Sequence, residues 1–235
     1  MSYLRIYHPR PQARLRLVCL PHAGGAATAY RAWSEALPPW IELVCVQYPG
    51  RQDRIDEPLV ADLPTLVDEV TAALPSGGRL ALFGHSMGAT VAFEVARRAR
   101  PVHLFLSAPA SGRTALHTAT DEQLLSEVKR FGGSGTALLE HPEIRRLALP
   151  VIRHDMKMLA AHEIADGPPL TCPITALVGD ADHTCPVEEA GGWATRTSAA
   201  FRLWVFAGGH HYLEGEAPRI VSLVAAQLER YSDGR

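Results

Sequence analysis

The sequence predicts a single α/β domain in which a mostly parallel sheet is covered by helices. Short apolar runs typical of buried strands occur at residues 15–20, 43–47, 80–83, 102–107, 174–178 and 201–206. Helical stretches at residues 30–37, 63–74 and 87–98 separate the earlier runs, and this alternation favours parallel strands. Because 235 residues are within what one α/β domain fills, we expect one domain over residues 1–235.

Two helical stretches carry the apolar patterns of helices that pack on such a sheet. The stretch at residues 87–98 is apolar nearly all the way round, so we place it against the centre of the sheet. The C-terminal helix has Pro218 in its first turn, where a missing N–H costs nothing. Its stripe of Val221, Val224 and Leu228 should face the sheet.

The segment from about residue 111 to 169 interrupts the alternation. It contains two or three helical stretches around Gly132, Gly133 and Gly135, and no convincing strand. We interpret it as a helical lid inserted over the carboxyl-terminal edge of the sheet. An ordinary pair of connecting helices is the alternative.

Composition and charge argue against several classes of protein. Apolar residues make up 47% and charged residues 20%, which is typical of a soluble globular chain. A formal net charge of -2 argues against a large basic face for nucleic acid. No apolar run reaches about 18 residues, and the N-terminus lacks a signal-peptide core. We therefore expect a cytoplasmic monomer with neither nucleic acid nor membrane as a partner.

The four cysteines are expected to be buried free thiols. Cys19 and Cys45 lie in apolar runs, Cys172 precedes another run, and Cys185 lies in a polar loop. Since no two of them have CxxC spacing, disulfides or a metal site are the less favoured alternatives. We expect no metal and no cofactor.

The sharpest functional signal is the pentapeptide Gly84-His85-Ser86-Met87-Gly88, which follows one predicted strand and opens a predicted helix. G-x-S-x-G at a strand-to-helix turn is typical of a nucleophilic serine, whereas the same pattern also occurs by chance in loops. The glycines remove Cβ atoms that would clash, so the turn should hold the Ser86 hydroxyl exposed. Free N–H groups at the helix start favour a negatively charged oxygen at the same point.

A nucleophilic serine requires a base, and histidine is the side chain whose pKa suits that task. In a serine hydrolase of this architecture the base follows the final strand, where Gly208-Gly209-His210-His211 lies. We predict His210 as the base in preference to His211, because the two glycines let the loop turn sharply before it. The histidines expected to be mere neighbours at this edge are His22, His85 and His183.

An orienting acid is expected after the run at residues 174–178, which leads into Asp180 and Asp182. Both are candidates, and Asp182 is preferred because its spacing fits a G-x-x-D turn, which leaves Asp180 to hydrogen-bond its own loop. Asp182 would fix the tautomer of His210 and stabilise its positive form. The order Ser86, Asp182, His210 is that of the α/β-hydrolase fold, which we predict.

Two backbone N–H groups are predicted to form an oxyanion hole. One belongs to Met87, next to the nucleophile, and the other to Ala23 in the loop Pro-His-Ala-Gly-Gly at residues 21–25. The glycines would permit close approach of the backbone to a substrate. A plain glycine-rich turn is the alternative.

Several segments together resemble type II thioesterases, the stand-alone editing hydrolases of polyketide and nonribosomal peptide assembly lines. They are residues 21–25, residues 48–54 (Tyr-Pro-Gly-Arg-Gln-Asp-Arg) with Glu57-Pro58 after them, residues 84–88, residues 149–155 (Leu-Pro-Val-Ile-Arg-His-Asp) and residues 208–210. The resemblance extends from about residue 15 to 230. It implies hydrolysis of acyl thioesters on the phosphopantetheine arm of acyl or peptidyl carrier proteins, through an acyl-enzyme on Ser86.

Some features leave alternatives open. His154 and His162 stand where the resemblance implies a small residue and an aromatic one. Arg51 and Arg54 are candidate contacts to an acidic carrier protein, or else solvated or structurally paired arginines. A general carboxylesterase or lipase is the second functional reading, because a triad does not declare its leaving group. A non-catalytic carrier-binding module is the third.

Overall fold

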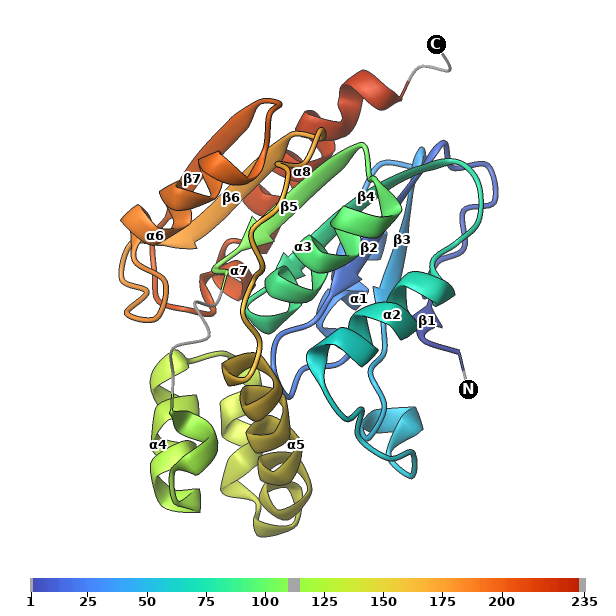
Figure 1. Cartoon of the computed structure of the whole chain (residues 1–235). Coiled ribbons are helices and arrows are strands. Elements are labelled where there is room, and N and C mark those ends of the chain that lie inside the picture. Colours follow the sequence, from blue (N-terminus) through green and yellow to red (C-terminus); the bar gives the residue numbers. More distant parts are fainter. Residues whose placement is uncertain (1, 110–114, 233–235) are drawn as a thin grey trace.

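A computed structural model describes residues 2–109 and 115–232, and its centre is a seven-stranded sheet of order β1-β3-β2-β4-β5-β6-β7 (Figure 1). The strands are β1 (Leu4–Arg5), β2 (Leu15–Leu20), β3 (Ile41–Val46), β4 (Arg79–His85), β5 (His103–Ser107), β6 (Ile174–Gly179) and β7 (Phe201–Phe206). β1 pairs antiparallel with β3, and the other neighbouring strands are parallel. The predicted mostly parallel α/β fold is confirmed.

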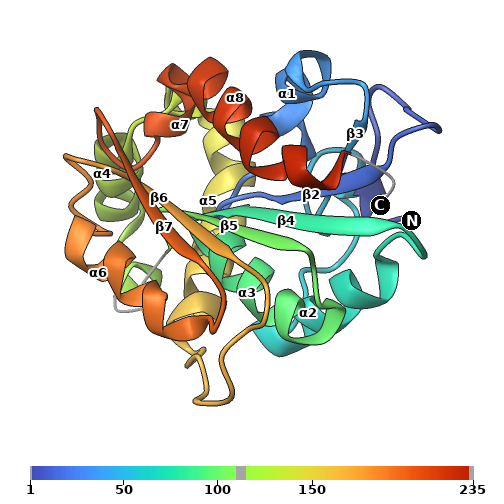
Figure 2. The same cartoon turned by 90° about the horizontal axis from the view of Figure 1, so that it is seen from above.

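Helices cover both faces of this sheet. The helices of the described residues are α1 (Arg31–Ala36), α2 (Leu63–Ala73), α3 (Met87–Ala99), α4 (Asp121–Phe131), α5 (Pro142–Ala160), α6 (Val187–Gly192), α7 (Tyr212–Gly215) and α8 (Ala217–Leu228). α1 and α8 lie on one face, and α2 and α3 lie on the other (Figure 2). Short 3-10 turns are η1 (Ala27–Tyr30), η2 (Gln52–Arg54), η3 (Leu116–Thr118), η4 (Ser134–Glu140), η5 (Trp193–Arg196) and η6 (Glu229–Tyr231).

The two-residue alternation of a strand explains why the sheet needs cover on both sides. In β2, Leu17 and Cys19 join the core under α1 and α8, whereas Val18 and Leu20 join the core under α2 and α3. Strand β1 was not predicted from the sequence, because a strand of two residues is too short to show a periodic pattern of apolar residues. β4 also continues beyond the predicted residue 83, so it ends directly beside Ser86.

The helical segment from η3 to α5 lies together at one end of the molecule (Figure 1). Residues 110–114 lie outside the described residues, and with them the first part of the predicted insertion at 111–169. α5 packs into the core through Met158 and Leu159, whereas α4 buries Leu124 and Phe131. Among the described residues, no helix is both long and apolar enough to cross a bilayer.

The cysteines follow the prediction. Cys19, Cys45, Cys172 and Cys185 are free and buried. Burial raises the pKa of the Cys172 thiol to about 11 and that of Cys185 to about 12. These thiols therefore stay protonated and are poor nucleophiles at neutral pH.

Adding a methyl group at the elbow should destabilise the fold. A Cβ at position 88 would lie 2.1 Å from the Leu20 carbonyl oxygen, so Gly88→Ala should lower the free energy of unfolding by about 1–3 kcal/mol or more. Urea unfolding measures this. The control is Gly192→Ala, where a Cβ meets nothing within 4 Å; a loss as large there would contradict the steric explanation.

Candidate active site

The elbow holds Ser86 in a backbone conformation that L-residues rarely adopt, with φ 55° and ψ -122°. Glycines make this turn possible: a Cβ on Gly84 would lie 2.1 Å from the carbonyl oxygen of Gly88. The strain therefore sits at a residue locked between β4 and α3, as expected of a functional position. The strand-to-helix context predicted for Ser86 is present.

The structure brings the three residues of the predicted triad together. His210 Nε2 lies 2.9 Å from Ser86 Oγ, and His210 Nδ1 lies 2.8 Å from Asp182 Oδ2. The loops after β4, β6 and β7 supply these residues at the carboxyl edge of the sheet. Ser86 is only 5% exposed, in contrast to the expected open hydroxyl. His210 lies against it, and the Phe131 ring packs 5.3 Å from the His210 ring.

Asp182 is fixed by more than the histidine. Its Oδ1 accepts hydrogen bonds from Thr184 N (2.8 Å), Thr184 Oγ1 (2.8 Å) and Cys185 N (3.2 Å). Burial raises the pKa of Asp182, but the hydrogen bonds from His210 and Thr184 outweigh burial and leave the pKa below its usual value. Asp182 is therefore held as a carboxylate.

Near Asp182, the structure adds one residue to the predicted site and changes the predicted partner of another. Thr184, which the sequence analysis did not single out, also has its Oγ1 2.9 Å from His210 Nδ1. The only signal for it was its position two residues after Asp182. Asp180 does not bond its own loop as expected; its Oδ1 accepts the Gly208 N–H at 2.9 Å. Asp180 thus links the acid loop to the histidine loop.

The predicted oxyanion donors lie at the ends of adjacent strands. Leu20 of β2 pairs with Gly84 of β4, so the residues after both strands share one edge. Met87 is the first residue of α3, whose N–H has no acceptor within the helix. In the described part of the chain, the Ala23 N–H has no hydrogen-bond acceptor, whereas the next N–H, of Gly24, donates to Asp155.

A cluster of imidazoles surrounds the candidate base. The ring of His85 lies 5.1 Å from that of His210, and the ring of His22 lies 4.7 Å from that of His211. Burial is the main cause that lowers the pKa of His211 to about 4 and the pKa values of His22 and His85 well below 6.5. The neighbouring imidazoles of the cluster lower all three further. Within the described residues, no group of three or more His, Cys, Asp or Glu side chains is arranged to hold a metal ion.

The two arginines of residues 48–54 are buried and paired. Arg51 makes two hydrogen bonds to Asp155, of 2.6 and 3.0 Å, and Arg54 makes two to Glu57, of 2.5 and 3.0 Å. The structural alternative therefore holds, and the suggested contact of these arginines with a carrier protein is wrong. Sequence alone could not show this, because buried and exposed arginines look the same in it.

The two unexpected histidines of the helical segment bind to the rest of the fold. His154 Nε2 lies 2.7 Å from the Val60 carbonyl oxygen, and His162 Nε2 lies 3.1 Å from Glu94 Oε1. His154 thus connects α5 to the loop before α2, and His162, just after α5, connects to α3.

Fold and site together define a serine hydrolase of the α/β-hydrolase class. Comparison with known proteins identifies the family, since residues 15–228 match the thioesterase domain. Thioesterase PikA5 of Streptomyces venezuelae is 40% identical, over 96% of this chain and 85% of that protein. The gramicidin S biosynthesis protein GrsT of Aneurinibacillus migulanus is 32% identical, over 92% and 90%.

Solved structures agree. The type II thioesterase BorB from the borrelidin biosynthetic cluster superposes with a TM-score of 0.87 at 38% identity, over 97% of this chain and 99% of that one. The chain belongs to the thioesterase domain family, and it is a serine hydrolase that acts on thioesters. The resemblance to type II thioesterases is confirmed.

Acid should destabilise the protein through its buried histidines. Between pH 6.5 and about 4, the unfolded chain binds a proton at His211 that the folded protein does not, so the free energy of unfolding falls as the pH falls through this range. Urea unfolding across the range measures the slope. His211→Gln should flatten it, and the exposed His141→Gln should not. An equal slope for both variants would contradict the assignment.

Proposed function

We propose that this protein hydrolyses acyl thioesters on the phosphopantetheine arm of acyl or peptidyl carrier proteins, using Ser86 as nucleophile, His210 as base and Asp182 as orienting acid. The observation that carries the proposal is the hydrogen bond from Ser86 to His210 at a strained elbow. The names of two relatives support the substrate class that we propose: PikA5 is named a thioesterase, and GrsT is named a gramicidin S biosynthesis protein. Editing of stalled or misloaded assembly lines is the role we propose.

The proposed reaction has two stages. Ser86 Oγ attacks the thioester carbonyl carbon while His210 takes the hydroxyl proton, and the N–H groups of Ala23 and Met87 stabilise the oxyanion. The C–S bond then breaks, and the leaving sulfur receives the proton from His210. A thiol with a pKa near about 8.5 leaves more readily than an amine. Water activated by His210 then cleaves the Ser86 ester and releases the carboxylic acid.

A cavity beside the triad supports a site for the acyl group. It has a volume of about 810 Å³ and lies between α4 and the loop after β6. Phe131 and Thr184 line it, and both contact His210. Apolar and polar side chains share its wall, which suits an acyl chain with some oxygen substituents.

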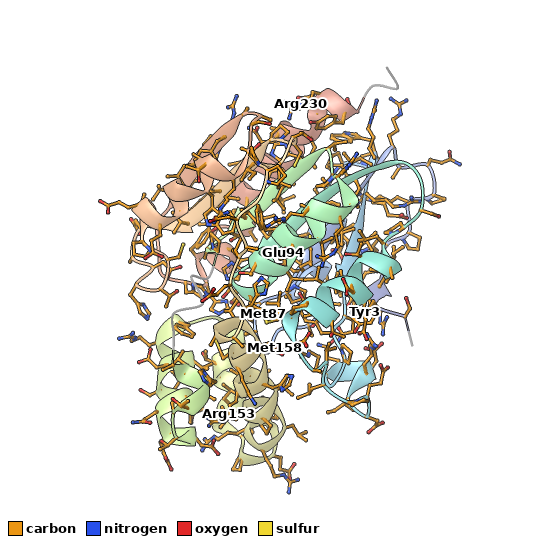
Figure 3. The ribbon with its side chains drawn as sticks, viewed as in Figure 1. Tyr3, Met87, Glu94, Arg153, Met158 and Arg230 are labelled. Carbon is orange, nitrogen blue, oxygen red and sulfur yellow. The ribbon has the colours of Figure 1, made fainter. Side chains whose placement is uncertain are left out.

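We propose that the segment from η3 to α5 acts as the lid of a single-domain enzyme. Phe131, at the end of α4, lies against His210, and Met87 lies at the end of α3 nearest α5 (Figure 3). Both helices of the segment therefore border the triad. We also propose, from the composition and the net charge of -2, a cytoplasmic monomer with neither nucleic acid nor membrane as a partner.

Substitution of the triad tests the mechanism. Ser86→Ala and His210→Gln should each lower kcat by about 10⁶-fold, and Asp182→Asn by about 10⁴-fold because it leaves His210 in the wrong tautomer. Steady-state hydrolysis of an acyl thioester measures these losses. Asp180→Asn is the control, because an amide oxygen can still accept from Gly208. Undiminished hydrolysis by Ser86→Ala would disprove the mechanism.

Leaving-group preference tests the substrate class. We expect kcat/KM to be highest for an acyl group on a carrier protein, lower for the same acyl group on free pantetheine, and lowest for its nitrophenyl ester. Release of the acid, followed by mass spectrometry, gives the three values. A preference for the nitrophenyl ester would favour a general carboxylesterase instead.

A further inference from the structure

Two sequence segments with no part in the triad meet in the interior. Arg51 comes from residues 48–54, and Asp155 comes from residues 149–155 on α5. Arg51 Nη1 donates to Asp155 Oδ2 at 2.6 Å, and Nη2 donates to Oδ1 at 3.0 Å. The Asp155 side chain is fully buried, and that of Arg51 is 9% exposed.

Asp155 also reaches the loop of the oxyanion hole. Its Oδ2 accepts the Gly24 N–H at 2.7 Å, one residue after Ala23. Gly24 has a φ of +73°, and a Cβ there would lie 2.4 Å from Ile152 Cγ1 of the same helix. The loop thus lies against α5 so closely that only glycine fits.

The same loop is attached to the core at its beginning. Tyr48 Oη donates to the Pro21 carbonyl at 3.3 Å, and the Arg51 guanidinium lies 5.3 Å from the centre of the Tyr48 ring. Arg51 therefore contacts a residue that holds the start of the loop, and its partner Asp155 holds the middle.

We propose that Asp155 and Arg51 are positioning residues. Through them, the packing of α5 against the loop of residues 21–25 determines whether the oxyanion hole forms. Asp155 fixes the peptide that follows Ala23, and Arg51 orients this carboxylate through two hydrogen bonds. If α5 moves away from this loop, the Gly24 N–H loses its acceptor, and the orientation of the Ala23 N–H is no longer fixed. This inference rests on the proposed role of Ala23 and is independent of which thiol leaves.

Matched double variants separate positioning from stability. Removing one partner of a buried ion pair strands a charge, so both variants carry Arg51→Met. Asp155→Asn keeps an oxygen that can accept the Gly24 N–H, whereas Asp155→Leu has similar size and no acceptor. The two proteins lack the same ion pair and differ in this one hydrogen bond.

We expect kcat for a small acyl thioester to be at least about tenfold lower in the Leu variant than in the Asn variant, with similar KM. Affinity for a trifluoromethyl ketone, whose adduct with Ser86 carries an oxyanion, should fall by the same factor. Thermal unfolding is measured in parallel. Equal kcat and equal ketone affinity in two folded variants would overturn the proposal. Failure of the carrier-protein preference alone would leave it standing.

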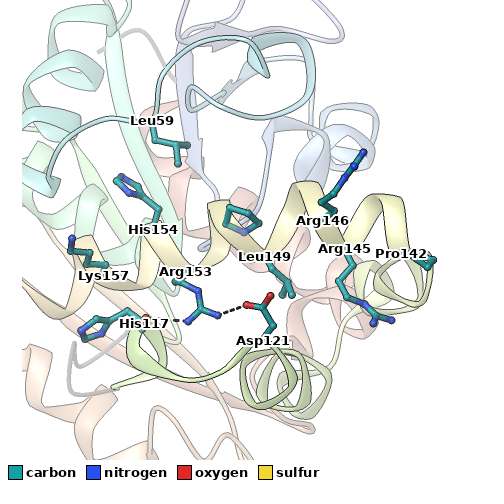
Figure 4. Close-up of a pocket in the computed structure, with 11 residues that line it drawn as sticks. Leu59, His117, Asp121, Pro142, Arg145, Arg146, Leu149, Arg153, His154 and Lys157 are labelled. Carbon is teal, nitrogen blue, oxygen red and sulfur yellow. Dashed lines mark hydrogen bonds and ion pairs between the residues drawn. The ribbon is translucent and has the colours of Figure 1, made fainter.

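The outer face of α5 carries a second, independent feature. A groove of about 910 Å³ follows this face (Figure 4). Its lining residues on α5 include Pro142, Arg145, Arg146, Leu149, Arg153 and Lys157. The α5 residues recur at three- and four-residue intervals, so one stripe of the helix forms the floor.

The groove is strongly basic, although the chain has a net charge of -2. Arg145, Arg146, Arg153 and Lys157 line it, and the single acid in the lining, Asp121, is paired with Arg153 at 2.6 Å. Arg146 and Lys157 are exposed. Positive charge concentrated in one groove of a weakly acidic protein attracts and orients an acidic partner.

We infer that this groove is the docking surface for the carrier protein, through carboxylates on the carrier. The inference rests on the proposed function. Arg51 and Arg54, the basic residues first considered for this contact, are buried, whereas the groove offers accessible cations on the helix that contacts the oxyanion loop. A carrier bound there would contact the helix whose Asp155 accepts the Gly24 N–H.

Charge reversal in the groove tests the docking surface. The variant is Arg146→Glu with Lys157→Glu, and the matched control is Arg98→Glu with Arg202→Glu, which reverses two exposed arginines elsewhere. The measured quantity is the ratio of kcat/KM for an acyl carrier protein to kcat/KM for the same acyl group on N-acetylcysteamine. We expect the groove variant to lose at least about tenfold in this ratio, with the control at the wild-type value.

The outcomes distinguish the two levels of inference. A groove variant that keeps the wild-type ratio would overturn the docking surface while the proposed function stands. A wild-type enzyme with no preference for the carrier-bound substrate would overturn the proposed function, and the docking surface with it. Raising the salt concentration should lower the ratio of the two kcat/KM values in the wild type and lower it less in the groove variant. This result would support an electrostatic basis for docking.

Discussion

The close approach of two backbone segments at the nucleophile is the constraint on which the site depends. Gly88 packs against the carbonyl oxygens of Leu20 and Pro21, with room for hydrogen alone. This contact brings the start of α3, where Met87 lies, beside the loop that follows β2 and contains Ala23. Because Ser86 is held in a strained turn between rigid elements, its direction is set before any substrate arrives.

Much of this site followed from sequence because chain order and local geometry determine it. Ser86 was predictable from glycines that a strand-to-helix turn requires, and His210 and Asp182 from the order in which strands of this fold end. Thr184, the Asp180 bond to Gly208 and the two-residue β1 were not predictable. Each depends on a tertiary contact or on an element too short to show a period.

The pairing of Arg51 with Asp155 also could not be predicted from the sequence. Asp155 and Arg51 are 104 residues apart in sequence, and nothing local to either residue predicts that they pair. A sequence shows that a charge exists, whereas burial decides whether it stabilises the interior or meets a partner. Of the cations that are exposed, Arg146 and Lys157 lie in one groove along α5. The interior face of that helix contacts the loop of residues 21–25, and its outer face lines a basic groove.

The span between Ser86 and His210 has a consequence for synthesis of the enzyme. The hydrogen bond between them joins residues 124 positions apart, and the histidine lies in the loop after β7. A growing chain on the ribosome therefore carries its nucleophile long before it carries a base. The hydrogen bond between Ser86 and His210 can therefore form only after β7 and the loop that follows it have been made.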